Sequence, residues 1–384
     1  MKILFVLGTR PEAIKLAPLI LAARSLPGVE AITCNTGQHR EMSSSALALF
    51  DIRADIDLEI MRVRQSLADI TCGILTALPA HLERLRPDWL VAQGDTTTTF
   101  AASLAAFYHK VPVAHIEAGL RTGNILAPWP EEMNRHLVSK LAALHFSPTS
   151  SAAANLVAEG VAPENIHVTG NTGIDALKWL VRRLDADPAL RELAKKEQVA
   201  AGIPDRIACG QGPYVLITAH RRESFGSGFE SICDAISELA GFFPDRSFVY
   251  PVHPNPAVRD TVFAKLDLKK HPNIFLVEPV CYLAFVDLMA RAELIMTDSG
   301  GVQEEAPSLG KRVIVMREST ERTEGLDTPY IRLAGSSREV IVTQARAALS
   351  GSWGKPENGS DIYGDGLASP RILKALLLQH DAVE

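Results

Sequence analysis

The sequence predicts an α/β protein with two Rossmann-like, doubly wound parallel-sheet domains that face a shared cleft. The chain has 384 residues, 47% of them hydrophobic, which is too long for one ordinary core and suits two domains. Short apolar runs alternate with amphipathic stretches, the order typical of a parallel sheet covered by helices on both faces. The alternation stops once, in a charged stretch at residues 173–212, and then restarts.

The first half of the chain contains six candidate strands, each a short run rich in apolar or β-branched residues. They lie at residues 2–8, 30–37, 88–95, 111–119, 145–148 and 165–171. Between them lie helical patterns such as residues 66–85 and 97–110. We therefore expect a first domain over residues 1–175, with the boundary region at about residues 175 to 210.

The second half repeats the same order of elements. Its candidate strands lie at residues 213–220, 247–253, 273–279, 294–300 and 312–318. These strands predict a second domain over residues 176–365, and residues 366–384 predict a last helix that packs back on the first domain. Doubly wound sheets bind ligands at the carboxyl ends of their strands, so the informative residues should follow strands.

Composition excludes several classes of function. The 39 Lys and Arg against 45 Asp and Glu give a net charge of −6, which does not favour a nucleic-acid or anionic-membrane partner. The five scattered cysteines suit a reducing cytoplasm, and no segment has the length of a signal-peptide core or a membrane span. The chain has no G-x-G-x-x-G motif after a strand, no P-loop and no H-x-x-x-H pair, so we expect neither cofactor nor metal.

The loop after the first strand, "GTRPEAIK", combines a helix start with two cations. Thr9 and Glu12 form a capping-box pattern with Pro11 in the first turn, which a well-capped helix explains fully. Helix capping does not explain Arg10, which we expect in the loop, whereas Lys15 fits a solvated helix side chain and a ligand-binding residue equally well. Two cations near a helix N-terminus favour a phosphate, so both are candidate ligand-binding residues.

Three acidic residues follow strands or begin helices in the first domain. Asp95 ends an apolar strand, where a turn or cap role alone would explain it, with Thr96 or Thr97 as the cap of the next helix. Glu117 follows another buried strand and is a candidate acid or base. Glu131 lies in a helix first turn, which the helix dipole alone would explain, and Arg135 lies one turn later, where it can pair with Glu131.

Two stretches of the second domain are suited to a diphosphate. "HRRESFGSG" puts His220, Arg221 and Arg222 after a strand and before a glycine-rich turn. In "TDSGGVQEEAPSLG", Ser299 can cap a helix while the two following glycines leave N–H groups open to phosphate oxygens. Glu305, one turn inside that helix, can accept hydrogen bonds from a ribose diol.

Ten motifs, taken in order, resemble the non-hydrolysing UDP-N-acetylglucosamine 2-epimerases. They are GTRPEAIK, TGQHREM, QGDT, EAGLRT, PEEMNR, HRRESFG, PVHPNP, DSGGVQEEAPSLGK, STERTEG and YGDGLASPRI, and the resemblance runs from residue 3 to about residue 372. Two departures are visible. Thr323 replaces a proline of the family, which affects loop rigidity, and Trp129-Pro130 precedes the acidic pair, where it would shape the sugar pocket.

This resemblance implies a fold like that of the B-type (GT-B) glycosyltransferases, a UDP-sugar in the central cleft and a homodimer. It implies that Asp95, Glu117, Glu131 and His220 are catalytic. It assigns substrate binding to Arg10, Arg135, Phe285, Ser299, Gly300, Gly301, Glu305 and Arg322, with Lys15 nearby. It also implies an activator site for a second UDP-sugar at Gln38, His39, Arg40 and His253.

The implied activity is the reversible conversion of UDP-GlcNAc to UDP-ManNAc, which would supply ManNAc for surface polysaccharide. Loss of UDP from C1 makes the C2 proton removable and yields 2-acetamidoglucal; protonation of the other face and return of UDP complete the inversion. Three alternatives stay open: an epimerase of a UDP-2,3-diacetamido sugar, a B-type glycosyltransferase, and a UDP-sugar sensor without catalysis. The first would differ in the C3 and C6 pockets, which the sequence does not define.

Overall fold

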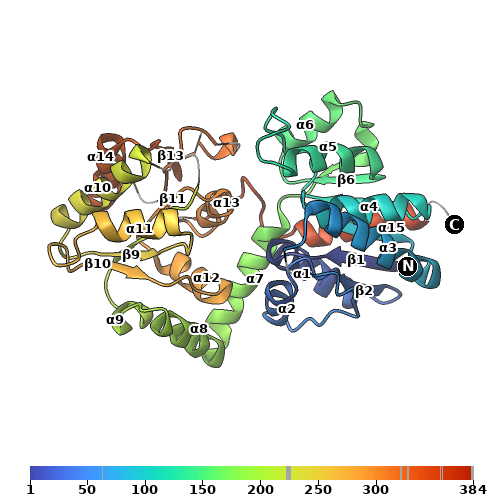
Figure 1. The fold of residues 1–384 in the computed structure, drawn as a ribbon, viewed down its shortest axis with the longest axis horizontal. Coiled ribbons are helices and arrows are strands. Elements are labelled where there is room, and N and C mark those ends of the chain that lie inside the picture. Colours follow the sequence, from blue (N-terminus) through green and yellow to red (C-terminus); the bar gives the residue numbers. More distant parts are fainter. Residues whose placement is uncertain are drawn as a thin grey trace. The chain divides into compact units, whose positions relative to one another are not determined.

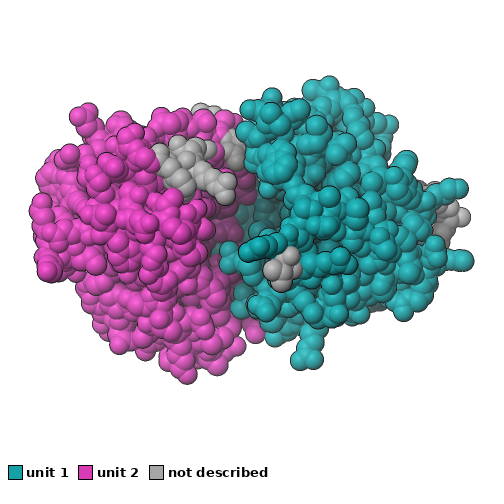
Figure 2. Space-filling view, in the orientation of Figure 1, with its two compact units in different colours: residues 1–178, 363–384 teal, residues 179–362 magenta. Residues whose placement is uncertain are grey.

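The computed structural model describes residues 1–62, 64–221, 226–320, 322–326, 328–354, 356 and 358–381. The chain forms two compact units, labelled by element in Figure 1 and coloured separately in Figure 2. Unit 1 comprises residues 1–178 and 363–384, and unit 2 comprises residues 179–362. Each unit has its own parallel sheet, as the alternation of strands and helices predicts.

Within its described residues, unit 1 has a seven-stranded sheet in the order β3-β2-β1-β4-β5-β6-β7, with every neighbouring pair parallel. The strands are β1 (Lys2–Leu7), β2 (Glu30–Asn35), β3 (Ile56–Asp57), β4 (Trp89–Gln93), β5 (Val113–Ile116), β6 (Leu144–Ser147) and β7 (Ile166–Val168). The helices are α1 (Arg10–Arg24), α2 (Arg40–Ala48), α3 (Leu67–Leu85), α4 (Thr97–Tyr108), α5 (Glu131–Leu141), α6 (Ser150–Ala158), the 3-10 turn η1 (Pro163–Asn165) and α15 (Ala368–Asp381). Helix α7 (Thr172–Ala186) continues from unit 1 into unit 2.

The described part of unit 2 has a six-stranded parallel sheet in the order β10-β9-β8-β11-β12-β13. Its strands are β8 (Tyr214–Thr218), β9 (Ser247–Pro251), β10 (Ile274–Val277), β11 (Leu294–Thr297), β12 (Val313–Val315) and β13 (Ile331–Leu333). Its helices are α8 (Pro188–Ala200), α9 (Asp205–Ala208), α10 (Ser227–Phe242), α11 (Pro256–Lys265), α12 (Tyr282–Arg291), α13 (Gly300–Ser308), the 3-10 turn η3 (Thr323–Gly325) and α14 (Arg338–Leu349).

Helix starts follow the local sequence chemistry. Ser66 caps α3 and forms a capping box with Asp69. Apolar residues then recur every fourth position along α3, at Ile70, Ile74, Leu78 and Leu82, and this face is buried in the core of unit 1. The predicted Thr9–Glu12 capping box of α1 is confirmed, and Thr96 caps α4 through the N–H of Thr99.

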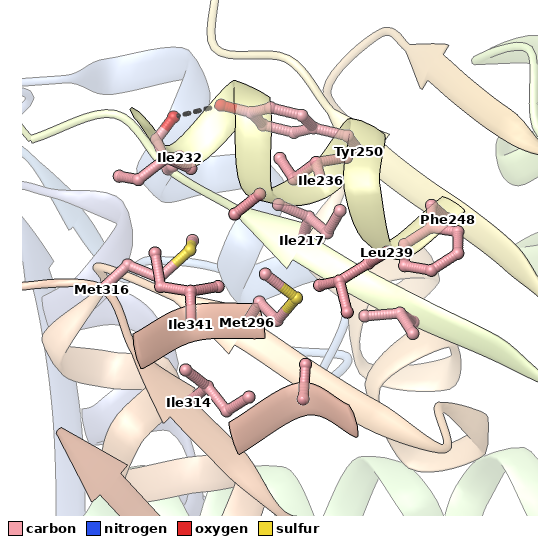
Figure 3. Close-up of a cluster of buried hydrophobic side chains, with 14 of the residues drawn as sticks. Ile217, Ile232, Ile236, Leu239, Phe248, Tyr250, Met296, Ile314, Met316 and Ile341 are labelled. Carbon is pink, nitrogen blue, oxygen red and sulfur yellow. Dashed lines mark hydrogen bonds between the residues drawn. The ribbon is translucent and has the colours of Figure 1, made fainter. Parts of the chain in front are cut away.

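The hydrophobic core of unit 2 holds the loop that follows strand β8. Figure 3 shows side chains from the strands and from α10 and α14 packed together, among them Ile217, Ile236 and Met296. Tyr250 is fully buried in this cluster, and its hydroxyl donates to the backbone oxygen of Ala219 at 2.9 Å. The loop that follows β8 is therefore anchored by the core at the residue before His220.

The C-terminal helix α15 belongs to unit 1 and packs on α1, as predicted. Asp175 of α7 caps it, because its carboxylate accepts hydrogen bonds from the N–H groups of Ala368 and Ser369 at 3.1 and 2.7 Å. Across the described ranges, no helix has both the length and the apolar character that a membrane crossing needs.

Candidate active site

The residues that follow β1, β2, β4 and β5 lie along one edge of the unit 1 sheet, because parallel strands end on the same side. The strand order reverses between β1 and β4, which is where doubly wound sheets bind ligands. A pocket of about 340 Å³ opens at this edge. It is lined by Thr9, Pro11, Glu12, Lys15, Gln38, His39, Leu67, Gln93, Gly94, Asp95, Thr96, Thr97, Glu117, Pro130 and Glu131.

Glu117 is held at the end of β5 in an unusual backbone conformation. Its φ is +65°, in the left-handed region that residues with a side chain rarely adopt. Its side chain is only 9% exposed and pairs with Lys15 of α1 through Oε2. Gln93 Nε2 donates to the same oxygen at 3.1 Å. Lys15, predicted as a nearby phosphate ligand, thus contacts a carboxylate predicted to be catalytic.

Asp95 is fixed by an ion-pair network in which it is partly exposed and its partner Arg135 is buried. Arg135 donates from Nε to Asp95 Oδ2 at 2.9 Å, with Nη2 paired at 2.7 Å to the same oxygen, and from Nη1 to Glu132 Oε2 at 2.8 Å. Burial tends to lower the pKa of Arg135, but the charge of Asp95 and the hydrogen bonds outweigh it and leave the pKa raised. The guanidinium therefore stays charged between two carboxylates.

The expected pairing of Arg135 with Glu131 is wrong. Arg135 lies on the face of α5 that carries Glu132, whose side chain is fully buried and also accepts from the N–H groups of Thr122 and Gly123. Burial raises the pKa of Glu132, but these hydrogen bonds and Arg135 leave it below the ordinary value. Glu131, the first residue of α5, lines the pocket instead.

Glu12 is a second buried carboxylate at the pocket. It is 1% exposed, and its Oε2 accepts from the N–H groups of Gly8 and Thr9 at 2.9 and 2.7 Å. Its Oε1 reaches to α4 and accepts from the hydroxyl of Thr96 at 2.6 Å. Burial raises its pKa, although these hydrogen bonds oppose the rise. Glu12 thereby ties the start of the helix that bears Lys15 to the start of the helix after Asp95.

In unit 2, His220 lies against a buried aspartate and a second histidine. Its Nδ1 is 3.3 Å from Oδ1 of Asp298, which is fully buried at the end of β11. Oδ2 of Asp298 accepts the backbone N–H of His220 at 2.5 Å and that of Arg221 at 2.7 Å. The His220 ring stacks on His253, with centroids 5.3 Å apart. Burial lowers the pKa of His220 despite the opposing charge of Asp298.

The start of α13 matches the predicted Ser-Gly helix start. Ser299 is the N-cap residue, although its side chain makes no capping hydrogen bond, and Gly300 begins the helix. A Cβ on Gly300 would lie 2.8 Å from the guanidinium carbon of Arg322, so a larger residue there would displace that cation. Arg322 pairs with Glu304 at 2.8 Å. Glu305 Oε1 accepts from the hydroxyl of Tyr282 at 2.9 Å, and Phe285 lies half-buried one turn further along α12.

Other predicted site residues lie in several places. Arg10 is exposed at the first position of α1 rather than in the loop, and it is not among the described residues that line the pocket. The residues predicted for an activator site are not all in one place. Gln38 and His39 line the pocket of the carboxylates. Arg40 pairs instead with Asp57 and Glu59. His253 lies in unit 2 against His220. Arg222, predicted beside a diphosphate, falls outside the described residues.

Four polar residues of these sites were missed as functional candidates from the sequence: Gln93, Glu132, Asp298 and Tyr282. Gln93 ends strand β4 and Asp298 follows strand β11, so their positions at strand ends could have identified them as candidates. Glu132 looked equivalent to Glu131, because sequence alone does not say which of two adjacent acids turns inward. Within the described part of the chain, no cluster of three or more His, Cys, Asp or Glu side chains is arranged to hold a metal ion.

The doubly wound sheet and its carboxylate-lined pocket define an α/β protein equipped for acid–base chemistry on a bound ligand. Residues 22–377 match the family described as UDP-N-acetylglucosamine 2-epimerase. The chain belongs to this family, and the resemblance predicted from its motifs is confirmed.

Relatives of full length support the assignment. The chain is 50% identical over 377 residues to a probable UDP-N-acetylglucosamine 2-epimerase of Ralstonia solanacearum, with 98% of each chain covered. It is 48% identical over 378 residues to the UDP-N-acetylglucosamine 2-epimerase of Escherichia coli K12, again with 98% of each covered. The structure of the Neisseria meningitidis UDP-GlcNAc 2-epimerase bound to UDP-GlcNAc superposes with a TM-score of 0.87 at 45% identity, covering 98% of this chain and 100% of that one.

Proposed function

We propose that this enzyme interconverts UDP-GlcNAc and UDP-ManNAc by eliminating UDP to 2-acetamidoglucal and adding it back. The observation that carries the proposal is that Asp95, Glu117 and Glu131 line one pocket together with Lys15. Inversion at C2 needs a base on one face of the sugar and an acid on the other, so a set of carboxylates on several elements fits the reaction. A glycosyltransferase would not need three acids there.

Glu117 and Asp95 are suited to serve as the base and the acid of the reaction. Each is paired with a cation, Glu117 with Lys15 and Asp95 with Arg135. We assign proton transfer at C2 to this pair. In each direction one residue, ionised, takes the C2 proton, the other, protonated, supplies a proton to the opposite face, and Glu131 is included in the proton-transfer set.

The leaving UDP is assigned to unit 2. The open N–H groups at the start of α13, the nearby Arg322 and His220 are suited to stabilise the developing diphosphate charge. Glu305 is suited to the ribose hydroxyls and Phe285 to the base. Among the cations of unit 1, Arg10 is exposed at the start of α1 and is assigned to the phosphates. Lys15 also pairs with Glu117, so we assign it a role beside that carboxylate as well as near the phosphates.

Product analysis tests this function. The enzyme is incubated with UDP-GlcNAc, and the mixture is followed by proton NMR, with a UDP-2,3-diacetamido sugar in a parallel reaction. The expected result is an equilibrium mixture of UDP-GlcNAc and UDP-ManNAc. Release of free ManNAc, or turnover of only the diacetamido sugar, would overturn the proposal. Glu117→Gln is the control variant, which should lose turnover but still bind UDP in a calorimetric titration.

Three further assignments belong to the same proposal. The enzyme acts in the cytoplasm as a homodimer and supplies ManNAc units for surface polysaccharide. A second UDP-sugar activates it through Gln38, His39, Arg40 and His253. Sedimentation velocity tests the dimer. Sigmoidal dependence of the initial rate on UDP-GlcNAc, lost in His39→Ala, tests the activation.

A further inference from the structure

Gln93 is a buried amide at the last position of β4, beside the end of β5. It is 3% exposed and is paired in the sheet with Ile116, the residue before Glu117. Its backbone oxygen accepts from the hydroxyl of Thr99 at 2.7 Å, which fixes the strand end. The side-chain Nε2 donates to Glu117 Oε2 at 3.1 Å, the oxygen that also contacts Lys15.

The fold alone does not require an amide at this position. The rest of β4, residues 89–92, is apolar and buried, and an apolar side chain would satisfy the sheet equally well. Burying an amide without a partner is costly, whereas the bond to Glu117 uses one of its donors. A neutral donor also fixes the carboxylate without adding a charge to a pocket that already holds Lys15.

The hydrogen bond from Gln93 fixes the orientation of the Glu117 side chain, which the backbone alone does not do. The backbone of Glu117 is held at φ +65° in the turn after β5. Two donors on one carboxylate oxygen, one from β4 and one from α1, restrict how the carboxylate can rotate. Hydrogen bonds to the charged form of a carboxyl group also favour ionisation.

We propose that Gln93 is a positioning residue that orients Glu117 and keeps its carboxylate ionised for proton abstraction. The proposal rests on the proposed function of Glu117 as a base. It predicts a specific kinetic signature for the loss of the amide, because the ionisation of a base sets the acidic limb of the pH profile of kcat/KM.

The test is Gln93→Met, which keeps the length of the side chain and removes the donor. We expect the acidic limb of kcat/KM for epimerisation to move up by about 0.5–1 pH unit, with kcat reduced about tenfold and KM changed less than twofold. Gln93→Glu should move the limb further, since it adds a like charge. The other titratable groups near Glu117 are the same in all variants: Lys15, Asp95, Glu12, His39 and Glu131 in the pocket, and the buried His115 of β5.

Gln198→Met is the matched control. Gln198 is fully buried in unit 2, where its amide donates to Asp287 Oδ2 at 2.7 Å and to the backbone oxygen of Ala284 at 3.1 Å, and its Oε1 accepts from Arg291 at 3.2 Å. Its loss therefore removes a buried amide–carboxylate bond that does not involve Glu117. We expect it to lower stability and leave the acidic limb unchanged. An unchanged limb in Gln93→Met, with only a loss of stability like that of the control, would overturn the proposal.

If Gln93→Met does not fold, Gln93→Asn, which keeps the amide but shortens its reach, takes its place with the same expected direction. Failure of the proposed function differs from failure of this proposal, because in the first case the unmodified enzyme itself would show no epimerisation and no pH profile could be measured.

Discussion

Replacing Arg135 by methionine tests whether Arg135 serves both the stability of unit 1 and the placement of Asp95. Arg135 is 9% exposed and bridges Asp95 and the fully buried Glu132. Removing one partner of a buried ion pair costs about 3–5 kcal/mol, because the remaining charge is left without compensation. For a domain of about 150–250 residues, this corresponds to a fall in Tm of roughly 6–20 °C.

The double variant Glu132→Gln/Arg135→Met separates the two effects. The introduced glutamine amide is neutral, and its oxygen can still accept from the N–H groups that Glu132 binds, so most of the stability should return. The turnover should not return, because Asp95 still lacks its cation. Thermal unfolding and kcat of both variants are the assay. A double variant no more stable than Arg135→Met, or one that recovers turnover, would refute the reasoning.

Two further predictions concern buried carboxylates. Glu12 has a pKa raised above its ordinary 4.5 by burial, so the folded state holds this proton to higher pH than the unfolded state. The Tm of the wild type relative to Glu12→Gln should therefore fall as the pH rises above 4.5, and a constant difference between pH 4 and 8 would contradict this. Asp175→Ala should cost about 0.5–2 kcal/mol and speed amide exchange at Ala368 and Ser369, since it removes the cap of α15; unchanged exchange would argue against the cap.

Hydrophobic runs and caps made most of the fold predictable. Strands such as β1 and β4 are mostly buried apolar runs, with Lys2 at the start of β1 and Gln93 at the end of β4 as polar exceptions. The starts of α1, α3 and α4 carry side chains that satisfy open N–H groups. Strands β3 and β13, which contain two and three residues at the edges of their sheets, were not predicted. Such short edge strands have too few residues for a periodic pattern, and pairing with a neighbour defines them.

The positions of the pocket carboxylates Asp95, Glu117 and Glu131 were predictable only in part. Asp95 and Glu117 follow strands, and the topology of parallel sheets brings such residues to one edge. Which acid of the pair at 131–132 faces the pocket depends on the rotation of α5, which the sequence does not fix. The bond from Lys15 to Glu117 joins residues 102 positions apart, so only the folded chain reveals it.

Incubation with UDP-GlcNAc in D₂O is the most direct test of the central claim, that carboxylates of the unit 1 pocket exchange the C2 proton. We predict deuterium at C2 of UDP-ManNAc and, with time, of UDP-GlcNAc, and a loss of this incorporation in Glu117→Gln. Epimerisation without deuterium at C2, or incorporation that is unchanged in Glu117→Gln, would contradict the account.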